Sequence, residues 1–168
     1  DVGGFETAAG LTGGGIMATG NYAGRARTAD ELRSDAAHAL RLIPGRHRFN
    51  LHAIYLETGG QTVDRNEIEP AHFQGWVDWA EELGLGIDFN PTYFSHPKAD
   101  DGYTLASRDE GIRAFWIEHA KRCRNITAAM GRAQGEAALH NVWIPDGEKD
   151  YTVDRYGRRA LLLNALDE

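Results

Sequence analysis

The segment RFNLHAIYL, residues 48–56, decides the fold. Its apolar residues alternate poorly with polar ones, because Ile54 interrupts the period-two pattern. A parallel strand that is covered on both faces has this kind of near-continuous apolar run. The chain then predicts a helix from Pro70, which suits a first helical turn, to Gly84, followed by a short strand over residues 85–89. Strand, helix and strand in this order predict a parallel α/β unit.

Further helices flank this unit on both sides. Residues 28–43 predict a helix with Thr28 as its N-cap and Glu31 as the partner in a capping box, and Pro44 ends it. Ser107 is the expected N-cap of a longer helix. The remaining predicted elements are a helix over residues 107–130, a third strand over 139–144 and a helix over 152–168.

The predicted order is loop–α–β–α–β–α–β–α, which indicates the α/β class with a parallel sheet. A length of 168 residues suits one domain. Three strands are too few for a closed barrel, and the last helix reaches the final residue without a stop signal. We therefore expect residues 1–168 to be a single incomplete domain from a larger α/β protein. Within it, residues 1–27 form a Gly-rich loop and residues 28–168 form the β/α units.

Composition excludes several classes of function. The formal net charge of −7 argues against a nucleic-acid or anionic-membrane surface, so neither nucleic acid nor membrane is expected as a partner. The chain has no apolar run of the roughly 18 residues that a membrane helix needs. The single cysteine, Cys123, excludes an internal disulfide and a multi-cysteine zinc site. A reducing, cytoplasmic setting fits this composition best.

Candidate site residues follow the predicted strands, because ligands of parallel α/β folds bind at the carboxyl ends of the strands. His52 is either a core imidazole hydrogen-bonded to the backbone or a side chain that reaches a ligand. Asp88 and Asn90 either cap the next loop or hold a ligand. Trp143 is either a core residue or an aromatic wall for a sugar face. His96, in the following loop, is a weaker candidate for a metal ligand.

Familiar catalytic motifs are missing from the sequence. There is no HExxH motif, no EF-hand loop and no nucleophile elbow. The glycines at 13–15 do not form a phosphate loop, because Asn21 and Tyr22 stand where a lysine and a serine or threonine are required. The residue patterns alone therefore indicate part of an α/β enzyme and go no further.

Longer strings are more specific, and with them the chain resembles the L-rhamnose isomerase family. The strings follow the order of the family and cover nearly the whole chain, and one extra glycine interrupts the first of them. They are GFE with LTGGGIMATGNYAGRAR (within residues 4–27), LRSDAAHALRLIPG (32–45), RFNLHAIYLE (48–57), DFNPTYFSHP (88–97) and NVWIPDGEKDYTVDR (141–155).

The resemblance implies a (β/α)8 TIM barrel, to which this chain supplies about three consecutive β/α units. It implies a metal-dependent aldose–ketose isomerase that interconverts L-rhamnose and L-rhamnulose, usually as a homotetramer, with Mn2+ as the typical cofactor. The metal ligands of the family lie on later strands, beyond Glu168. We therefore assign no catalytic residue and no metal ligand to this chain.

The resemblance assigns part of the sugar pocket to this chain. His52 is expected to hydrogen-bond a sugar hydroxyl or the ring oxygen. Phe94 and Trp143 are expected to form apolar walls that suit the 6-methyl group of a deoxy sugar. Phe5, in the opening loop, is expected to reach the site of a neighbouring subunit.

Two alternatives remain open at this point. In the first, the same barrel prefers another 6-deoxy sugar or a rare aldose, because one methyl group changes the binding free energy by only about 1–3 kcal/mol. In the second, the 168-residue chain on its own is an inactive, truncated domain, since an incomplete barrel leaves a sheet edge unpaired.

Overall fold

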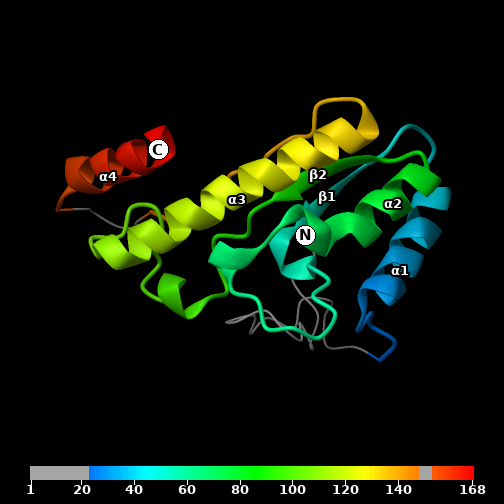
Figure 1. Ribbon diagram of the computed structural model, residues 1–168, viewed down its shortest axis with the longest axis horizontal. Helices are drawn as coiled ribbons and strands as arrows, with labels where there is room; N and C mark the ends of the chain where they lie inside the picture. The colour runs from blue at the N-terminus through cyan, green and yellow to red at the C-terminus, as the bar shows by residue number, and fades with distance from the viewer. Residues whose placement is uncertain (1–22, 148–152) are drawn as a thin grey trace.

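The computed structural model describes residues 23–147 and 153–168. Its sheet consists of two parallel strands, β1 (Arg48–His52) and β2 (Gly86–Asn90) (Figure 1). The register pairs Arg48 with Gly86 and His52 with Asn90, so both strands end at the same edge. The predicted α/β class and the parallel pairing of the first two strands are confirmed.

The predicted strand boundaries are partly wrong. β1 ends at His52, because residues Ala53–Tyr55 turn into a short 3-10 helix, η1. The strand predicted over 139–144 is reduced to one parallel bridge between Phe89 and His140. Phe89 donates its N–H to Leu139 O (2.9 Å) and accepts from the Asn141 N–H (2.8 Å). The third segment therefore lies beside β2 in the predicted direction but extends the sheet by a single residue pair.

The helices lie close to their predicted places. Within the described residues they are α1 (Ala29–Arg41), α2 (Gln74–Glu82), α3 (Glu110–Gln134) and α4 (Arg155–Asp167). Pro70 begins a 3-10 turn, η3 (Pro70–Phe73), which leads directly into α2. Asp109 caps α3 in place of the predicted Ser107 by accepting the Ile112 N–H. No helix in this part of the chain is both long and apolar enough to span a bilayer.

One of the two predicted capping hydrogen bonds of α1 is present. Thr28 Oγ1 accepts the backbone N–H of Glu31 at 3.2 Å, as expected of an N-cap. The Glu31 carboxylate accepts the N–H of Arg27 (2.5 Å) instead of that of Thr28. The predicted capping box is therefore shifted by one residue.

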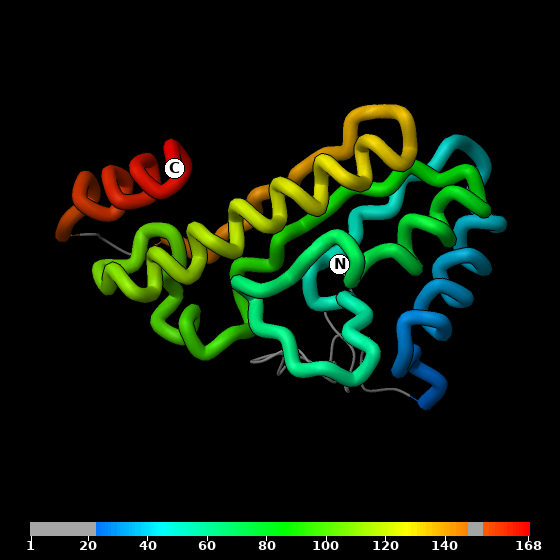
Figure 2. Tube along the Cα trace, viewed as in Figure 1, coloured from blue at the N-terminus to red at the C-terminus, as the bar shows by residue number. Residues whose placement is uncertain are grey.

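The main core lies between the sheet, α2 and α3, which runs along β2 in Figure 2. Phe73, Trp76, Phe89 and Ile126 are fully buried there. The Trp76 indole N–H donates to Tyr55 O at 2.9 Å, which fixes the turn after β1 against α2. A second apolar cluster contains Trp116 of α3 and Ala165 of α4, and it docks the last helix onto α3.

Asp88 joins the three segments of the sheet region. Its carboxylate accepts from Arg48 Nε (2.8 Å) and Nη2 (2.7 Å), and from the Leu139 N–H (2.6 Å). Asp88 is 6% exposed, and the hydrogen bond from Arg48 lowers the pKa of its carboxyl group below its ordinary value. The ion pair therefore attaches the Leu139 segment to both strands.

Replacing Asp88 by Asn in the intact protein is expected to lower the free energy of unfolding by about 2 kcal/mol, because Arg48 loses the more buried of its two carboxylate partners among the described residues and keeps only Glu136. Chemical denaturation at pH 7 measures this loss. Since the folded pKa of Asp88 is lowered, its contribution is present above the ordinary carboxyl pKa and is lost as the pH falls below about 4.

Asp30→Asn is the matched control, since this exposed carboxylate pairs with Arg33 at 2.7 Å on the surface of α1. Its loss is expected to cost less than about 0.5 kcal/mol. Equal effects of the two substitutions would contradict the role given to Asp88.

Candidate functional site

Three of the four predicted pocket residues meet at the carboxyl ends of the strands. His52 ends β1, Phe94 lies in the loop after β2, and Trp143 follows the His140 bridge. The ring centroids of His52 and Phe94 are 6.2 Å apart, and those of Phe94 and Trp143 are 4.8 Å apart, both edge to face. Phe5 lies outside the described residues, so its expected place is not tested.

His52 is 3% exposed, and one of its ring nitrogens contacts the Thr92 side chain. Its Nδ1 lies 3.0 Å from Thr92 Oγ1, and that hydroxyl is placed to donate to Asn90 O at 3.2 Å. Because a hydroxyl carries one hydrogen, this network assigns the proton of His52 to Nδ1. Nε2 then carries the lone pair. Burial lowers the pKa of His52 to about 4, so the ring is neutral at physiological pH.

Exposure increases along the aromatic row. His52 is buried, Phe94 is half-buried and Trp143 is 53% exposed. The row therefore forms a continuous apolar wall from the end of β1 to the surface, with one hydrogen-bonding group at its inner end. An apolar wall with few polar groups is typical of small-molecule pockets.

The loop after β2 has a defined and strained shape. Asn90 Oδ1 accepts the N–H of Thr92 at 2.9 Å, which starts a tight turn. Thr92 and Ser95 have positive φ values of 59° and 57°, which are unusual for residues other than glycine. Phe94 lies between them, so the position of its ring depends on this local geometry.

Arg65, which the sequence did not indicate as a site residue, lies in η2 (Arg65–Glu67) between β1 and α2 and is fully buried. Its Nη1 donates to Thr92 O, and its Nη2 donates to Phe94 O (3.3 Å) and Ser95 O (3.4 Å). Burial lowers the pKa of this guanidinium to about 10. Arginine in a polar stretch usually lies at the surface, so its sequence neighbours carry no signal of this role.

The segment that carries Trp143 is anchored by Asp146. Asp146 Oδ1 accepts the backbone N–H groups of Thr104 (2.7 Å) and Ala106 (2.6 Å), and Oδ2 accepts the Thr104 hydroxyl. Both residues that donate these bonds are buried. Asn90 therefore caps the following loop, as in the first alternative, whereas the hydrogen bonds of Asp88 in the described structure go to Arg48 and to the distant Leu139 N–H.

The weaker metal-ligand candidate, His96, has both ring nitrogens engaged. Nδ1 accepts the Lys98 N–H (3.0 Å), so Nε2 carries the proton and donates to Asp64 Oδ1 (3.0 Å). Burial lowers the pKa of His96, and the hydrogen bond to Asp64 opposes this shift. Within residues 23–147 and 153–168 no group of three or more metal-ligating side chains is present.

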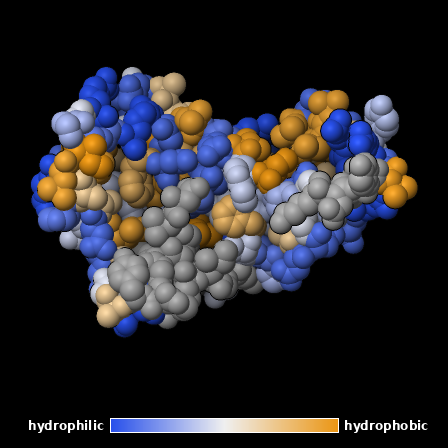
Figure 3. Space-filling model, turned by 180° about the vertical axis from the view of Figure 1, so that it is seen from behind, coloured by the Kyte–Doolittle hydropathy of each residue, from blue (hydrophilic) through white to orange (hydrophobic). Residues whose placement is uncertain are grey.

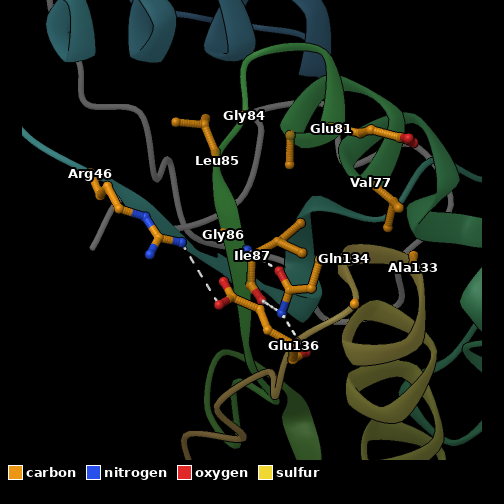
Figure 4. Close-up of a pocket in the computed structure, with 12 residues that line it drawn as sticks. Arg46, Val77, Glu81, Gly84, Leu85, Gly86, Ile87, Ala133, Gln134 and Glu136 are labelled. Atoms are coloured by element: carbon orange, nitrogen blue, oxygen red, sulfur yellow. Dashed lines mark hydrogen bonds and ion pairs between the residues drawn. The ribbon is translucent and has the colours of Figure 1, made fainter.

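A cavity of about 400 Å³ lies at the opposite end of the sheet (Figure 4). Arg46, Gln134 and Glu136 line it together with Ile87, near the start of β2. Gln134 accepts the Ile87 N–H (2.7 Å) and donates to Ile87 O (3.1 Å), while Arg46 lies 3.8 Å from Glu136. Because these groups bind one another at the amino end of the strand, the cavity is a structural junction and not the candidate site.

Comparison with known proteins identifies the family of the chain. The family model described as L-rhamnose isomerase (RhaA) matches residues 1–168. Curated L-rhamnose isomerases from Listeria monocytogenes and Klebsiella pneumoniae are each 56% identical over all 168 residues, and each match covers 40% of the relative. The enzyme of that name from Rhodopirellula baltica is 57% identical over 167 residues, 99% of this chain and 39% of the relative. The chain thus spans about 40% of the length of the relatives it matches, and it belongs to the L-rhamnose isomerase family.

Proposed function

We propose that the intact protein interconverts L-rhamnose and L-rhamnulose as an aldose–ketose isomerase. The observation that carries this proposal is the row formed by His52, Phe94 and Trp143 at the carboxyl end of the sheet, in a chain of this family. This chain then supplies binding groups for the sugar.

The chemistry of the row fits a 6-deoxy sugar. The rings of Phe94 and Trp143 offer an apolar surface to the methyl group and help to exclude water. Nε2 of His52 carries a lone pair, so it accepts a hydrogen bond from a sugar hydroxyl. A ring oxygen can only accept a hydrogen bond, and Nε2 carries no proton in this tautomer. Of the two expected partners of His52, the proposal therefore keeps the sugar hydroxyl.

We propose further that the sheet is the first part of a TIM barrel. Support comes from the parallel order of β1, β2 and the His140 bridge, which follow one another in the chain. Leu139, Val142 and Trp143 are exposed beside the sheet, as expected of a strand whose next neighbour lies elsewhere in the protein. On the face of the molecule drawn in Figure 3, apolar residues form several separate patches.

A manganese ion is part of this proposal, but the described residues do not fit it, since they contain no cluster of three or more metal-ligating side chains. Its ligands would come from other parts of the protein. A homotetramer, a cytoplasmic location, the reach of Phe5 into a neighbouring site and the inactivity of the isolated chain all stay predictions.

The test of the function is a steady-state assay of the intact protein with L-rhamnose, with L-rhamnulose quantified as the product. L-mannose and L-lyxose serve as comparison substrates, because they replace the 6-methyl group by a hydroxymethyl group and by hydrogen. The proposal expects the highest kcat/KM for L-rhamnose. A higher value for another aldose would favour the alternative substrate, and absence of turnover with all three would overturn the isomerase assignment.

Replacing Trp143 by Ala is expected to raise KM for L-rhamnose about tenfold with little change in kcat, since the ring contributes binding surface and no reacting group. Trp143→Phe should retain most of the affinity because it keeps an aromatic wall. Tyr156→Ala removes an exposed ring on α4 and serves as the control. A loss confined to kcat in Trp143→Ala would contradict the wall role.

A further inference from the structure

Arg65 is a buried cation whose guanidinium has no carboxylate partner within the described residues. It is fully buried, and its Nε lies buried without a hydrogen-bond partner in this part of the chain. The carboxylate of Asp64, its neighbour, binds the Arg65 backbone N–H and the His96 ring instead. Burying a charge without a counter-charge costs free energy. The hydrogen bonds that the guanidinium does make must therefore account for its burial here.

All of those contacts go to one loop. Nη1 and Nη2 donate to the carbonyl oxygens of Thr92, Phe94 and Ser95. The planar guanidinium presents several N–H groups in fixed directions, so one side chain can hold three carbonyl groups. A lysine ammonium lacks this planar arrangement.

The loop needs such a restraint. Thr92 and Ser95 adopt left-handed backbone conformations with φ of 59° and 57°, and non-glycine residues adopt these at a cost. The carbonyl groups of both residues are among the three that Arg65 binds. Arg65 therefore stabilises the loop at the two positions where its backbone is strained.

A histidine of α3 lies beside both Arg65 and the start of the Thr92–Ser95 loop. His119 is fully buried, and its two ring nitrogens lie 2.8 Å from Arg65 O and 2.8 Å from Pro91 O. Since burial lowers the pKa of His119 to about 3, the ring is neutral and donates to one carbonyl at a time. It connects the turn that carries Arg65 to the start of the strained loop.

The loop contacts both the hydrogen-bonding group and the apolar wall of the aromatic row. The Thr92 hydroxyl sets the tautomer of His52, and the Phe94 ring lies against both His52 and Trp143. A change in the loop therefore moves the acceptor and the wall together.

We propose that Arg65 is a positioning residue that sets the preference for a sugar with a C6 methyl group, by holding the Thr92–Ser95 loop so that Phe94 stands at its place in the wall. The inference rests on the proposed function. Arg65 touches no substrate. Its effect on the preference for the methyl group acts through Phe94, whereas a shift of Thr92 and His52 affects both sugars alike.

The test compares kcat and KM for L-rhamnose and L-lyxose in the intact protein and its Arg65→Met variant. L-lyxose has the same ring without the methyl group. Arg65→Met is expected to lower kcat/KM for L-rhamnose at least about tenfold, mainly through KM, and to lower that for L-lyxose much less. The ratio of the two values is the readout, because a general loss of folded enzyme lowers both equally. Arg65→Lys is expected to restore part of the ratio.

Arg113→Met is the control, since Arg113 also donates to a loop carbonyl, Ser107 O at 2.7 Å, away from the aromatic row. Its ratio should equal that of the wild type. Equal losses for both sugars in Arg65→Met would assign Arg65 a purely structural role and overturn the inference.

If Arg65→Met does not fold, a double-mutant cycle tests whether Arg65 acts through Phe94. Arg65→Lys is measured alone and together with Phe94→Ala. If Arg65 acts through Phe94, Arg65→Lys changes the ratio of kcat/KM for L-rhamnose to that for L-lyxose when Phe94 is present. The same substitution has little further effect on this ratio in the Phe94→Ala background. Additive effects would overturn the inference. A wild-type protein that converts neither sugar would overturn the proposed function itself, and this outcome is distinct from an active enzyme with an unchanged ratio.

Discussion

Removing divalent metal from the intact protein is expected to lower turnover of L-rhamnose at least about a hundredfold, and adding Mn2+ is expected to restore it. The described part of the chain is expected to keep its structure during this treatment, because its own residues include no cluster of three or more metal-ligating side chains. The measurement is the isomerase rate after chelation and dialysis, with tryptophan fluorescence recorded in parallel.

The structure gives this prediction a specific control. His96 and Asp64 form a His–carboxylate pair, as two ligands of a metal would, but both ring nitrogens of His96 are used within the protein. His96→Gln is therefore expected to leave the metal content per chain unchanged, as measured by elemental analysis. Full turnover in metal-free protein would contradict the metal requirement, and loss of bound metal in His96→Gln would contradict the placement of its ligands elsewhere.

The order of helices and strands was predictable because it depends on local periodicity. Thr28 caps α1 and Gly84 follows α2 as expected, since caps and breakers act within one turn. The end of β1 was not predictable, because the 3-10 turn Ala53–Tyr55 is as apolar as the strand before it. The third strand also differs, since a strand needs backbone hydrogen bonds from a neighbouring strand. In the described residues Phe89 makes the two ladder hydrogen bonds of this segment, to Leu139 and Asn141 on either side of His140.

The candidate site was predictable only where long sequence strings carried information. Resemblance pointed to His52, Phe94 and Trp143, and the structure brings them together. Arg65 could not be found in this way, because its partners are 27 to 30 residues away and are backbone carbonyl groups, which have no sequence signature. The left-handed conformation of Thr92 was not predictable either, since glycine is the residue type that usually indicates a positive φ in a sequence.

The second large effect is expected at His52. Replacing His52 by Asn is expected to lower kcat/KM for L-rhamnose by about 10- to 100-fold, the range for a lost hydrogen bond to a substrate. Asparagine places an N–H group near the position of Nδ1, so the contact with Thr92 Oγ1 can persist while the Nε2 acceptor is removed. His38→Asn, at an exposed position of α1, is the control and should leave kcat/KM unchanged.

The pH dependence of this loss tests the environment of His52 separately. The neutral ring is the form that accepts a hydrogen bond at Nε2, and burial lowers its pKa to about 4. Protonation therefore removes the acceptor only as the pH falls towards that value. The ratio of kcat/KM between the wild type and His52→Asn is expected to stay constant from about pH 8 to pH 5.5, where an unperturbed histidine with a pKa of about 6.5 would already lose most of its neutral form. Taking the ratio cancels the titration of groups that both proteins share, including any metal ligands. A ratio that falls towards one below pH 7 would mean that His52 titrates as an exposed imidazole, and the buried, Thr92-bonded geometry would then not be the one that meets the sugar.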